Sequence, residues 1–305
     1  MTFSIVAHDP EQEAIGVAVQ SKFVSVGSVV PFASAEAGAI ATQSFANVAY
    51  GSEGLDHLRN GLTAEETVEE LVAADDEAER RQVGVVGADG SVAGFTGEEC
   101  FDTALDVQGD RYTAQGNILE NEATIHAMAE RFEETDGGLP ERLIAALYAA
   151  DEAGGDSRGK QSAALYVVKP EGGYDGGNDR WIDVRVDDHD EPITELERVF
   201  KLYDVTLLSR AEPDDLEMLT GETADEVADT LVSLGFLDEA DADVEAFEEQ
   251  QRAALESFRG MNNFENHSLA VVEDALARGW DVAEGEGEAR MVDAIWHGLQ
   301  RLDRE

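Results

Sequence analysis

The stretch MTFSIVAHDPEQEAIGVAVQ at residues 1–20 decides the fold, because it places two strand-like runs at the start of the chain. The runs at 3–8 (FSIVAH) and 14–20 (AIGVAVQ) are rich in β-branched and apolar residues, and the DPEQE segment between them is typical of a turn. The sequence therefore predicts a β-hairpin. Chain termini are seldom built directly into a core, so this position suggests a chemical role for the terminus itself.

The expected register of this hairpin places Thr2 opposite Gln20, across a five-residue turn at 9–13. Alternation along the strands would then put one set of residues on each face. One face would carry Thr2, Ser4, Val6, His8, Ala14, Gly16 and Ala18, and the other Phe3, Ile5, Ile15, Val17 and Val19. A slip of one residue would place Ser21 opposite Thr2 instead.

Thr2 becomes a candidate nucleophile if Met1 is removed, which the small Thr2 side chain permits. The freed α-amine, with a pKa of about 8, would lie beside the hydroxyl of its own residue and could accept the hydroxyl proton. Gln20, Ser21 and Lys22 are the polar neighbours expected to assist by hydrogen bonding. The alternative is that Thr2 is an ordinary strand residue.

The rest of the first two thirds of the chain shows strands in groups, with helices in pairs between them. Further strands are expected at 38–43, 82–87, 91–97, 111–117, 162–168 and 181–187. Helices are expected at 49–61 and 63–75, then as a pair of which the first contains Ile125 and the second Leu143, and finally from about Pro192. This grouping differs from strict strand–helix alternation and favours antiparallel sheets with helices packed outside, an α+β layered domain.

The chain changes character after residue 210, where strand-like runs become rare. Helices are expected at 222–236, 243–259, 268–279 and 288–302. We therefore expect a first domain at 1–208 and a small helical domain at 211–305.

The composition of the chain indicates the solvent conditions to which the protein is adapted and excludes some classes of binding partner. The chain has 67 acidic and 21 basic residues, a formal net charge of -46, yet 43% of its residues are hydrophobic. A folded core under such a surface indicates adaptation to molar salt, where the Debye length is only about 3 Å. Nucleic acid and anionic membranes are unsuitable partners, because binding phosphates needs a basic stripe. No secretory signal or long apolar run is visible, so we expect a cytoplasmic protein.

Cofactor and metal motifs are not found in the sequence. Cys100 is the single cysteine, which excludes an intrachain disulfide and a cysteine-based zinc cluster. The six histidines are scattered and no HExxH pattern occurs, so VDDHDE at 186–191 is read as a solvated turn. We expect neither a metal nor a cofactor.

Two polar clusters at strand ends could donate hydrogen bonds to an oxyanion. Gln43 lies in Thr42-Gln43-Ser44, and Asn117 ends the run Gln115-Gly116-Asn117. Asn117 and the backbone near Gln43 are the preferred donors to developing negative charge. The alternative is that these residues simply close strands.

The segment GGDSRGKQS at 154–162 imitates a phosphate-binding loop, but Gln161 replaces the required Ser or Thr and the loop precedes a strand. A better interpretation is a substrate-binding loop that presents Asp156, Arg158, Gln161 and Ser162. Arg158 suits a carboxylate on the substrate. The alternative is a plain turn in which Asp156 and Arg158 pair with each other.

Several long motifs, in order, resemble the family of unknown function DUF1028. They include the opening stretch, YGSEGLDHLRNGLTAEE (50–66), QVGVVGADGSVAGFTG (82–97), AQGNIL (114–119) and the run from GGDSRGKQS to PITEL (154–196). The resemblance spans residues 1 to about 205. It implies the N-terminal nucleophile (Ntn) hydrolase superfamily, a four-layer αββα sandwich and amide hydrolysis as the reaction class.

The C-terminal part has a weaker likeness to a small helical module labelled peptidoglycan-binding. LVSLGF (231–236), AALESFRGMNNFE (253–265) and MVDAIWHGL (291–299) carry it. This likeness covers the expected second domain.

Compared with the proteasome-like branch of the superfamily, Thr2 matches the nucleophile, whereas Gln20 stands where that branch keeps an aspartate. The third strand carries no matching lysine, and Lys22 is the nearest one. The leading hypothesis is a cytoplasmic, salt-adapted amidohydrolase of the Ntn type that acts on a small amide with Thr2 as the nucleophile and forms a homo-oligomer. The rivals are a non-catalytic protein that binds a glycan or protein partner through the sandwich and C-terminal module, and a purely structural homo-oligomer.

Overall fold

The computed structural model describes residues 2–101 and 103–304, so the expected removal of Met1 concerns a residue outside them. The chain divides into two compact units, Met1–Glu197 and Arg198–Glu305, and each is described by itself. Among the described residues, no helix is both long enough and apolar enough to span a bilayer.

The first unit contains two antiparallel sheets. The six-stranded sheet has the order β10-β9-β2-β1-β8-β7, and the four-stranded sheet the order β3-β4-β5-β6. The strands are β1 (Thr2–Asp9), β2 (Ala14–Ser21), β3 (Pro31–Ser34), β4 (Gly38–Ser44), β5 (Arg81–Gly87), β6 (Val92–Thr96), β7 (Leu105–Gly109), β8 (Tyr112–Asn117), β9 (Ser162–Val168) and β10 (Arg180–Val186).

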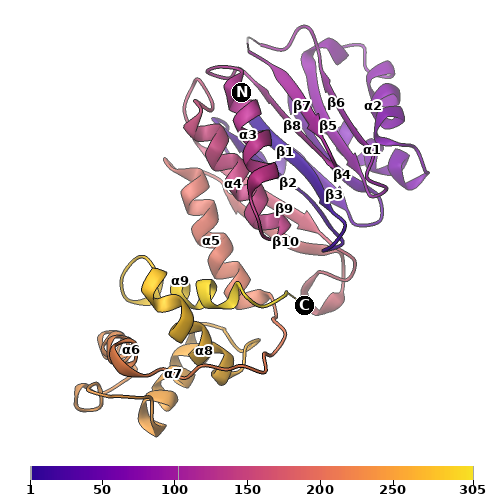
Figure 1. The fold of residues 1–305 in the computed structure, drawn as a ribbon. Coiled ribbons are helices and arrows are strands. Elements are labelled where there is room, and N and C mark those ends of the chain that lie inside the picture. Colours follow the sequence, from indigo (N-terminus) through magenta and orange to yellow (C-terminus); the bar gives the residue numbers. More distant parts are fainter. Residues whose placement is uncertain (1, 102, 305) are drawn as a thin grey trace. The chain divides into compact units, whose positions relative to one another are not determined.

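Two pairs of helices cover these sheets (Figure 1). Helices α1 (Ala49–Arg59) and α2 (Ala64–Ala73) pack on the four-stranded sheet, whereas α3 (Ala123–Glu134) and α4 (Leu139–Glu152) pack on the six-stranded one. The sheets pack against each other, with β1 and β2 against β4 and with β8 against β5. This mixed architecture, with antiparallel sheets and a helical C-terminal region, agrees with the α+β class expected from the sequence.

The hairpin register differs by one residue from the expected one. Thr2 pairs with Ser21 and Asp9 with Ala14, so the turn has four residues and the expected pairing of Thr2 with Gln20 is wrong. The Asp9 carboxylate accepts the N–H groups of Glu11 and Gln12 and tightens the turn. The one-residue change moves the apolar side chains of β2 onto the face of Thr2.

The shared face of β1 and β2 forms the core between the two sheets. Its buried residues include Val6, Ile15, Val17 and Val19, which pack with residues of β4, β5 and β9 such as Ala41. At roughly 1.5–3 kcal/mol for each fully buried branched side chain, this cluster stabilises the sheet-on-sheet packing. The N-terminal strand is therefore held firmly along its whole length.

Two edge strands, β3 and β7, were not expected from the sequence. Each lies at the edge of its sheet, and β3 begins with Pro31, a residue tolerated at the start of an edge strand because it cannot donate to the ladder. In such short strands, the alternation of apolar and polar residues covers too few positions to be recognised in the sequence.

The expected capping box of α2 is confirmed, because Thr63 and Glu66 each accept the other's backbone N–H.

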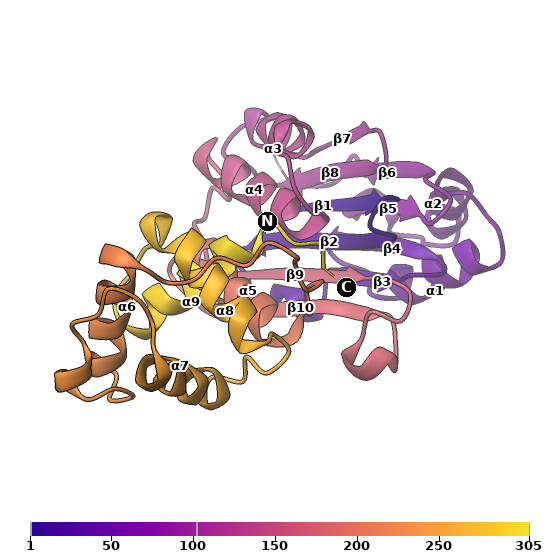
Figure 2. The ribbon, with the colours of Figure 1, turned by 60° about the horizontal axis from the view of Figure 1, so that its bottom comes forward.

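The second unit is helical (Figure 2). Its helices are the C-terminal part of α5 (Pro192–Leu207), then α6 (Gly221–Ser233), α7 (Glu249–Met261), α8 (Leu269–Gly279) and α9 (Glu288–Leu299). Helix α7 begins six residues later than expected, because Glu248 caps it and Phe247 is buried ahead of it. Leu231, Leu255 and Trp280 belong to a single apolar core in this unit.

His267 gives this second unit a pH-dependent stability. It is 2% exposed, and its Nε2 lies 3.0 Å from the Val205 carbonyl oxygen, to which the neutral ring can donate. Burial, and after it the nearby Arg210 guanidinium, lowers the pKa of His267 from 6.5 to about 4. Between these two pH values the unfolded chain binds a proton that the folded chain does not.

We therefore expect the stability contributed by His267 to be complete above pH 6.5 and to fall as the pH drops toward 4, by roughly 2–4 kcal/mol in all. Urea unfolding of the full chain at pH 7 and pH 5, followed by tryptophan fluorescence, measures the change. His267→Gln keeps an amide donor for Val205 and does not titrate, so it should lose most of this pH dependence. An equal pH dependence in the variant would contradict the assignment.

Candidate active site

A row of four polar residues crosses the six-stranded sheet at one end. The registers align Asn117 of β8 with Thr2, Thr2 with Ser21, and Ser21 with Ser162 of β9. Because paired residues share a face, all four side chains point the same way. That face is the one toward the four-stranded sheet, since Ser4, two residues after Thr2, bonds to Gln43 of β4.

Thr2 lies at the centre of this row. It is 8% exposed, and its Oγ1 lies 3.0 Å from the Oγ of Ser21, close enough for either hydroxyl to donate to the other. The Gln43 Nε2 donates to the Thr2 carbonyl oxygen at 3.4 Å. The hydroxyl and the backbone of Thr2 are thus both held by neighbouring polar groups.

Buried side chains between the two sheets form a hydrogen-bond network next to this row of polar residues. Gln43 Nε2 donates to Gln82 Oε1 at 2.8 Å, and Gln43 Oε1 accepts the Ser4 hydroxyl at 2.7 Å. Gln115 Nε2 donates to Ser4 Oγ at 2.7 Å, and Asn117 Nδ2 donates to Gln82 Oε1 at 3.0 Å. All five side chains are at most 1% exposed. Buried polar groups with several partners define one arrangement and resist displacement.

Gly84 of β5 makes room for this network. A Cβ at this position would lie 2.2 Å from Gln115 Oε1, which is far inside van der Waals contact. A residue with any side chain here would push the Gln115 amide away from Ser4. The network therefore depends on a close approach of the β5 backbone.

A pocket of about 380 Å³ opens above Thr2, a volume typical of small-molecule sites. Its polar lining includes the Thr2 and Ser21 hydroxyls and the amides of Gln43 and Asn117. The other described lining residues are Phe23, Val26, Val29, Val30, Ser44, Phe45, Ala46, Phe101, Ile118 and Arg158. A small polar patch surrounded by apolar walls is the usual composition of a ligand site.

Two lining residues have unusual backbone conformations. Ser44 has φ 70° and Ile118 has φ 51°, in the left-handed region that is especially unfavourable for β-branched residues such as isoleucine. They directly follow Gln43 and Asn117, at or just after the ends of β4 and β8. Such strain gathers at functional sites, where the surrounding structure maintains it.

The structure does not bring two of the expected catalytic residues to Thr2. Gln20 pairs with Phe3, so its side chain points to the opposite face of the sheet, where its Oε1 and Nε2 are buried with no hydrogen-bond partner among the described residues. Lys22 is exposed, and its Nζ donates to the Lys160 carbonyl oxygen at 3.0 Å. Neither side chain lines the pocket, whereas those of Ser21, Gln43 and Asn117 do.

The loop at 154–162 contributes only Arg158 to the described lining. Asp156 is buried beneath it, accepts the backbone N–H groups of Lys22 and Arg158, and lies 3.4 Å from the Arg158 guanidinium. Gln161 donates to Asp188 Oδ1 at 3.0 Å, and Ser162 donates to the Phe23 carbonyl oxygen. Asp156, Gln161 and Ser162 thus fix loops, while Arg158 faces the pocket.

Three phenylalanines of the lining were not anticipated from the sequence. Phe23, Phe45 and Phe101 are 50%, 37% and 53% exposed, although large apolar side chains are normally buried. Phe23 and Phe45 each follow a strand-end polar residue within two positions, which is a usable sequence signal. No comparable signal precedes Phe101.

The described lining contains very few groups that can exchange protons at neutral pH. The described lining contains no lysine, histidine or carboxylate, and Arg158 is the one charged side chain among the lining residues that the structure describes. Among the described residues, no group of three or more His, Cys, Asp or Glu side chains is arranged to hold a metal ion.

Comparisons with known proteins agree with this architecture. A family model described as "Family of unknown function (DUF1028)" matches residues 2–196, and one described as "Putative peptidoglycan binding domain" matches residues 206–296. The crystal structure of a DUF1028 protein from Silicibacter pomeroyi is 35% identical, with a TM-score of 0.61, covering 67% of this chain and 89% of that one.

A second solved structure, Anbu (ancestral beta-subunit) from Yersinia bercovieri, is 13% identical with a TM-score of 0.31, covering 66% of this chain and 93% of that one. No curated protein matches the chain.

Proposed function

The chain belongs to the DUF1028 family of unknown function, and from this premise we propose that its first unit is an N-terminal nucleophile amidohydrolase. The observation that carries the proposal is the Thr2 hydroxyl, placed in a pocket and 3.0 Å from the Ser21 hydroxyl. The helix pairs on the outer faces of two packed sheets support an αββα sandwich of the Ntn type. The substrate we propose is a small amide.

The acylation step begins once Met1 has been removed. The Thr2 Oγ1 attacks the amide carbonyl carbon while its proton passes to the free Thr2 α-amine, either directly or through Ser21. The tetrahedral intermediate then collapses, the C–N bond breaks, and the leaving amine takes the proton back from the α-ammonium group. The products of this step are an acyl ester on Thr2 and the free amine.

The deacylation step uses water. The α-amine accepts a proton from the water as its oxygen attacks the ester carbonyl carbon, and the C–O bond to Thr2 then breaks. The proton returns to Thr2 Oγ1, which restores the enzyme and releases the carboxylic acid. The net reaction consumes one amide and one water.

The oxyanion formed in both steps needs donors that are already in place. Asn117 Nδ2 uses one hydrogen for Gln82 and has a second that can serve an oxyanion. The second proposed donor is the backbone N–H directly after Gln43, that of Ser44, whose backbone has the left-handed conformation. Gln20 and Lys22 have no role in this mechanism.

The base assignment predicts a simple pH profile. Because the described pocket holds no other group that titrates near neutrality, the rate of Thr2 acylation by a β-lactone should rise with pH and level off above the α-amine pKa, about 8. Mass spectrometry of the modified N-terminal peptide over pH 6–9 measures the rate. A bell-shaped profile, or a flat one, would show that a different base is used.

The alternative function is ligand binding without turnover. It is favoured by the lack of any lysine or carboxylate in the described part of the pocket. Under this alternative, ligands bind in the pocket but the β-lactone leaves Thr2 unmodified at every pH. The labelling experiment therefore separates the two functions.

A further inference from the structure

The segment at residues 44–48 leads from the end of β4 into α1 and forms part of the pocket wall. Ser44, Phe45 and Ala46 of this segment line the pocket. Ser44 has φ 70°, a left-handed conformation that persists in a residue other than glycine only where the surrounding structure maintains it. The geometry of this wall therefore depends on the groups that contact the segment.

The backbone N–H of Ser44 is directed toward the pocket side of β4. The Thr42 N–H donates to the carbonyl oxygen of Val30 at 3.1 Å, and Val30 lines the pocket. The Phe45 N–H points the other way and donates to the Arg80 carbonyl oxygen at 3.3 Å. Because successive N–H groups of a strand point to alternate sides, the Ser44 N–H lies on the same side as that of Thr42.

Two consecutive arginines hold the main chain and the ring of Phe45. Arg81 pairs with Ser44 in the sheet, and its Nη1 donates to the Phe45 carbonyl oxygen. The Arg81 side chain is only 13% exposed. The Arg80 guanidinium lies 3.9 Å from the centroid of the Phe45 ring. The position of the segment thus depends on the direction in which the Arg81 guanidinium points.

Asp75 sets that direction and also contacts the segment itself. Its Oδ2 accepts hydrogen bonds from Arg81 Nε at 2.9 Å and from Asn47 Nδ2 at 3.2 Å. Its Oδ1 accepts the Glu77 backbone N–H at 2.9 Å, and its side chain is 12% exposed. The hydrogen bond from Arg81 holds the pKa of the Asp75 carboxyl well below its usual range. The carboxylate is therefore charged at neutral pH, and hydrogen bonds to a charged group are the stronger ones.

We propose that Asp75 and Arg81 are positioning residues, which together fix the Ser44 backbone N–H where it can donate to the oxyanion. This inference rests on the proposed function, because that N–H is one of its two oxyanion donors. Such a donor is effective only when it is already aligned with the position that the oxyanion will occupy. Neither Asp75 nor Arg81 is among the described lining residues, so the pair acts through the segment at 44–48.

The test compares the wild type with Asp75→Ala in the labelling of Thr2 by a β-lactone in molar KCl. We expect the variant to lower the limiting rate at saturating lactone by about 10²-fold, and to change the half-saturating concentration by less than about threefold. The rate should still level off at the same pH, because the Thr2 α-amine remains the base. A variant that only weakened lactone binding would instead raise the half-saturating concentration, and that result would contradict the positioning role.

Two further variants keep the test decisive if Asp75→Ala does not fold. Asp75→Asn retains one acceptor oxygen but no charge, so it should fold and lose only about tenfold in the limiting rate. Arg81→Gln should lose about as much as Asp75→Ala. If the two residues act as a unit, the double variant should lose no more than either single one. Losses that multiply in the double variant would contradict a shared role.

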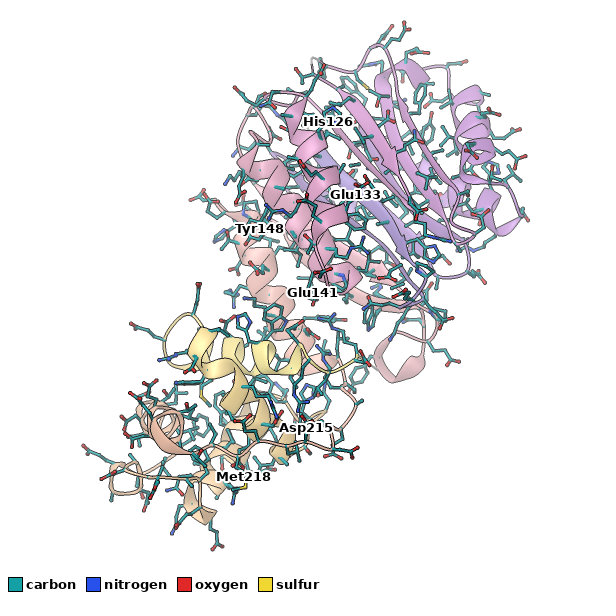
Figure 3. All side chains as sticks on the ribbon, in the orientation of Figure 1. His126, Glu133, Glu141, Tyr148, Asp215 and Met218 are labelled. Atoms are coloured by element: carbon teal, nitrogen blue, oxygen red, sulfur yellow. The ribbon has the colours of Figure 1, made fainter. Side chains whose placement is uncertain are left out.

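Two carboxylates of the same unit provide matched controls. The Asp9 side chain is 11% exposed, accepts two backbone N–H groups, and lies at the opposite end of β1 from Thr2. Glu133, labelled on α3 in Figure 3, accepts the Tyr112 hydroxyl at 2.7 Å. Asp9→Ala and Glu133→Ala each remove one negative charge and its hydrogen bonds, yet both should keep the wild-type limiting rate. A loss in these controls equal to that in Asp75→Ala would overturn the proposal.

Amide hydrogen exchange separates this inference from the proposed function. In Asp75→Ala, peptides that cover residues 44–48 should exchange at least about tenfold faster, whereas peptides that cover β8 should not change. If wild-type Thr2 is never labelled, the proposed function fails, while faster exchange at 44–48 would still support control of the segment by Asp75. Unchanged exchange at 44–48, or labelling of Asp75→Ala at the wild-type limiting rate, would reject the inference and leave the proposed function standing.

Discussion

Replacing Thr2 with Ala is expected to reduce the modification of the N-terminal residue by a β-lactone by about 10³-fold or more. The variant removes the hydroxyl that would attack and leaves the amide network formed by Ser4, Gln43 and Gln82 in place. Thr2 is only 8% exposed and its hydroxyl lies 3.0 Å from that of Ser21, so losing this hydroxyl should cost about 1 kcal/mol, the net contribution of one hydrogen bond, and should leave the protein folded. Intact-mass measurement over time follows the reaction.

Thr2→Ser is the matched control, since it keeps the hydroxyl and the α-amine and should retain measurable labelling. Thermal unfolding of all three proteins tests whether the fold is intact. If Thr2→Ala were labelled at the same site and rate as the wild type, Thr2 would not be the nucleophile. Loss of labelling in a variant that also unfolds early would be checked with Thr2→Ser.

Lowering the KCl concentration from 3 M to 0.2 M is expected to remove more than half of the folding stability, which for domains is roughly 5–15 kcal/mol. The net charge is -46, and the buried acidic side chains among those described are only Asp9, Asp156, Asp204, Glu273 and Asp274. Repulsion between the remaining carboxylates is screened within about 3 Å at molar salt but extends to about 8 Å near physiological ionic strength.

Urea unfolding at several KCl concentrations measures this dependence. Sucrose is a useful control, because it favours the compact state through exclusion from the surface but does not screen charge. We expect sucrose at low salt to recover only a small part of the lost stability. Stability that does not change with KCl, or full recovery in sucrose, would contradict adaptation through charge screening.

The sequence was sufficient to predict the elements that have strong local patterns. The first hairpin, the Thr63 capping box and the helices of both units follow from alternation, capping residues and helical periodicity. These signals depend on neighbours in sequence. They do not depend on how the sheets pack, so they could be read in advance.

The hairpin register could not be read in the same way. It depends on whether Asp9 ends the strand or begins the turn, and the hydrogen bonds from its carboxylate to Glu11 and Gln12 decide this. The one-residue difference determines that Ser21 faces Thr2 and that Gln20 does not. An error of one position in a turn therefore changed which side chains could serve the site.

The parts of the site that come from distant segments were the least predictable. Ser21, Gln43 and Asn117 could be proposed because polar residues at strand ends tend to meet at one edge. The contribution of Phe101, and the burial of Ser162 under a loop rather than in the pocket, depend on loop conformations. Loop conformation is set by long-range contacts that no local pattern records.

The most direct test of the central claim is the intact mass and N-terminal peptide of the purified native protein. The proposed mechanism requires a free α-amine on Thr2, so it predicts that Met1 is absent and that Thr2 is the first residue. A protein that retains Met1 has an amide nitrogen where the base is needed. That result would contradict the assignment of Thr2 as an N-terminal nucleophile.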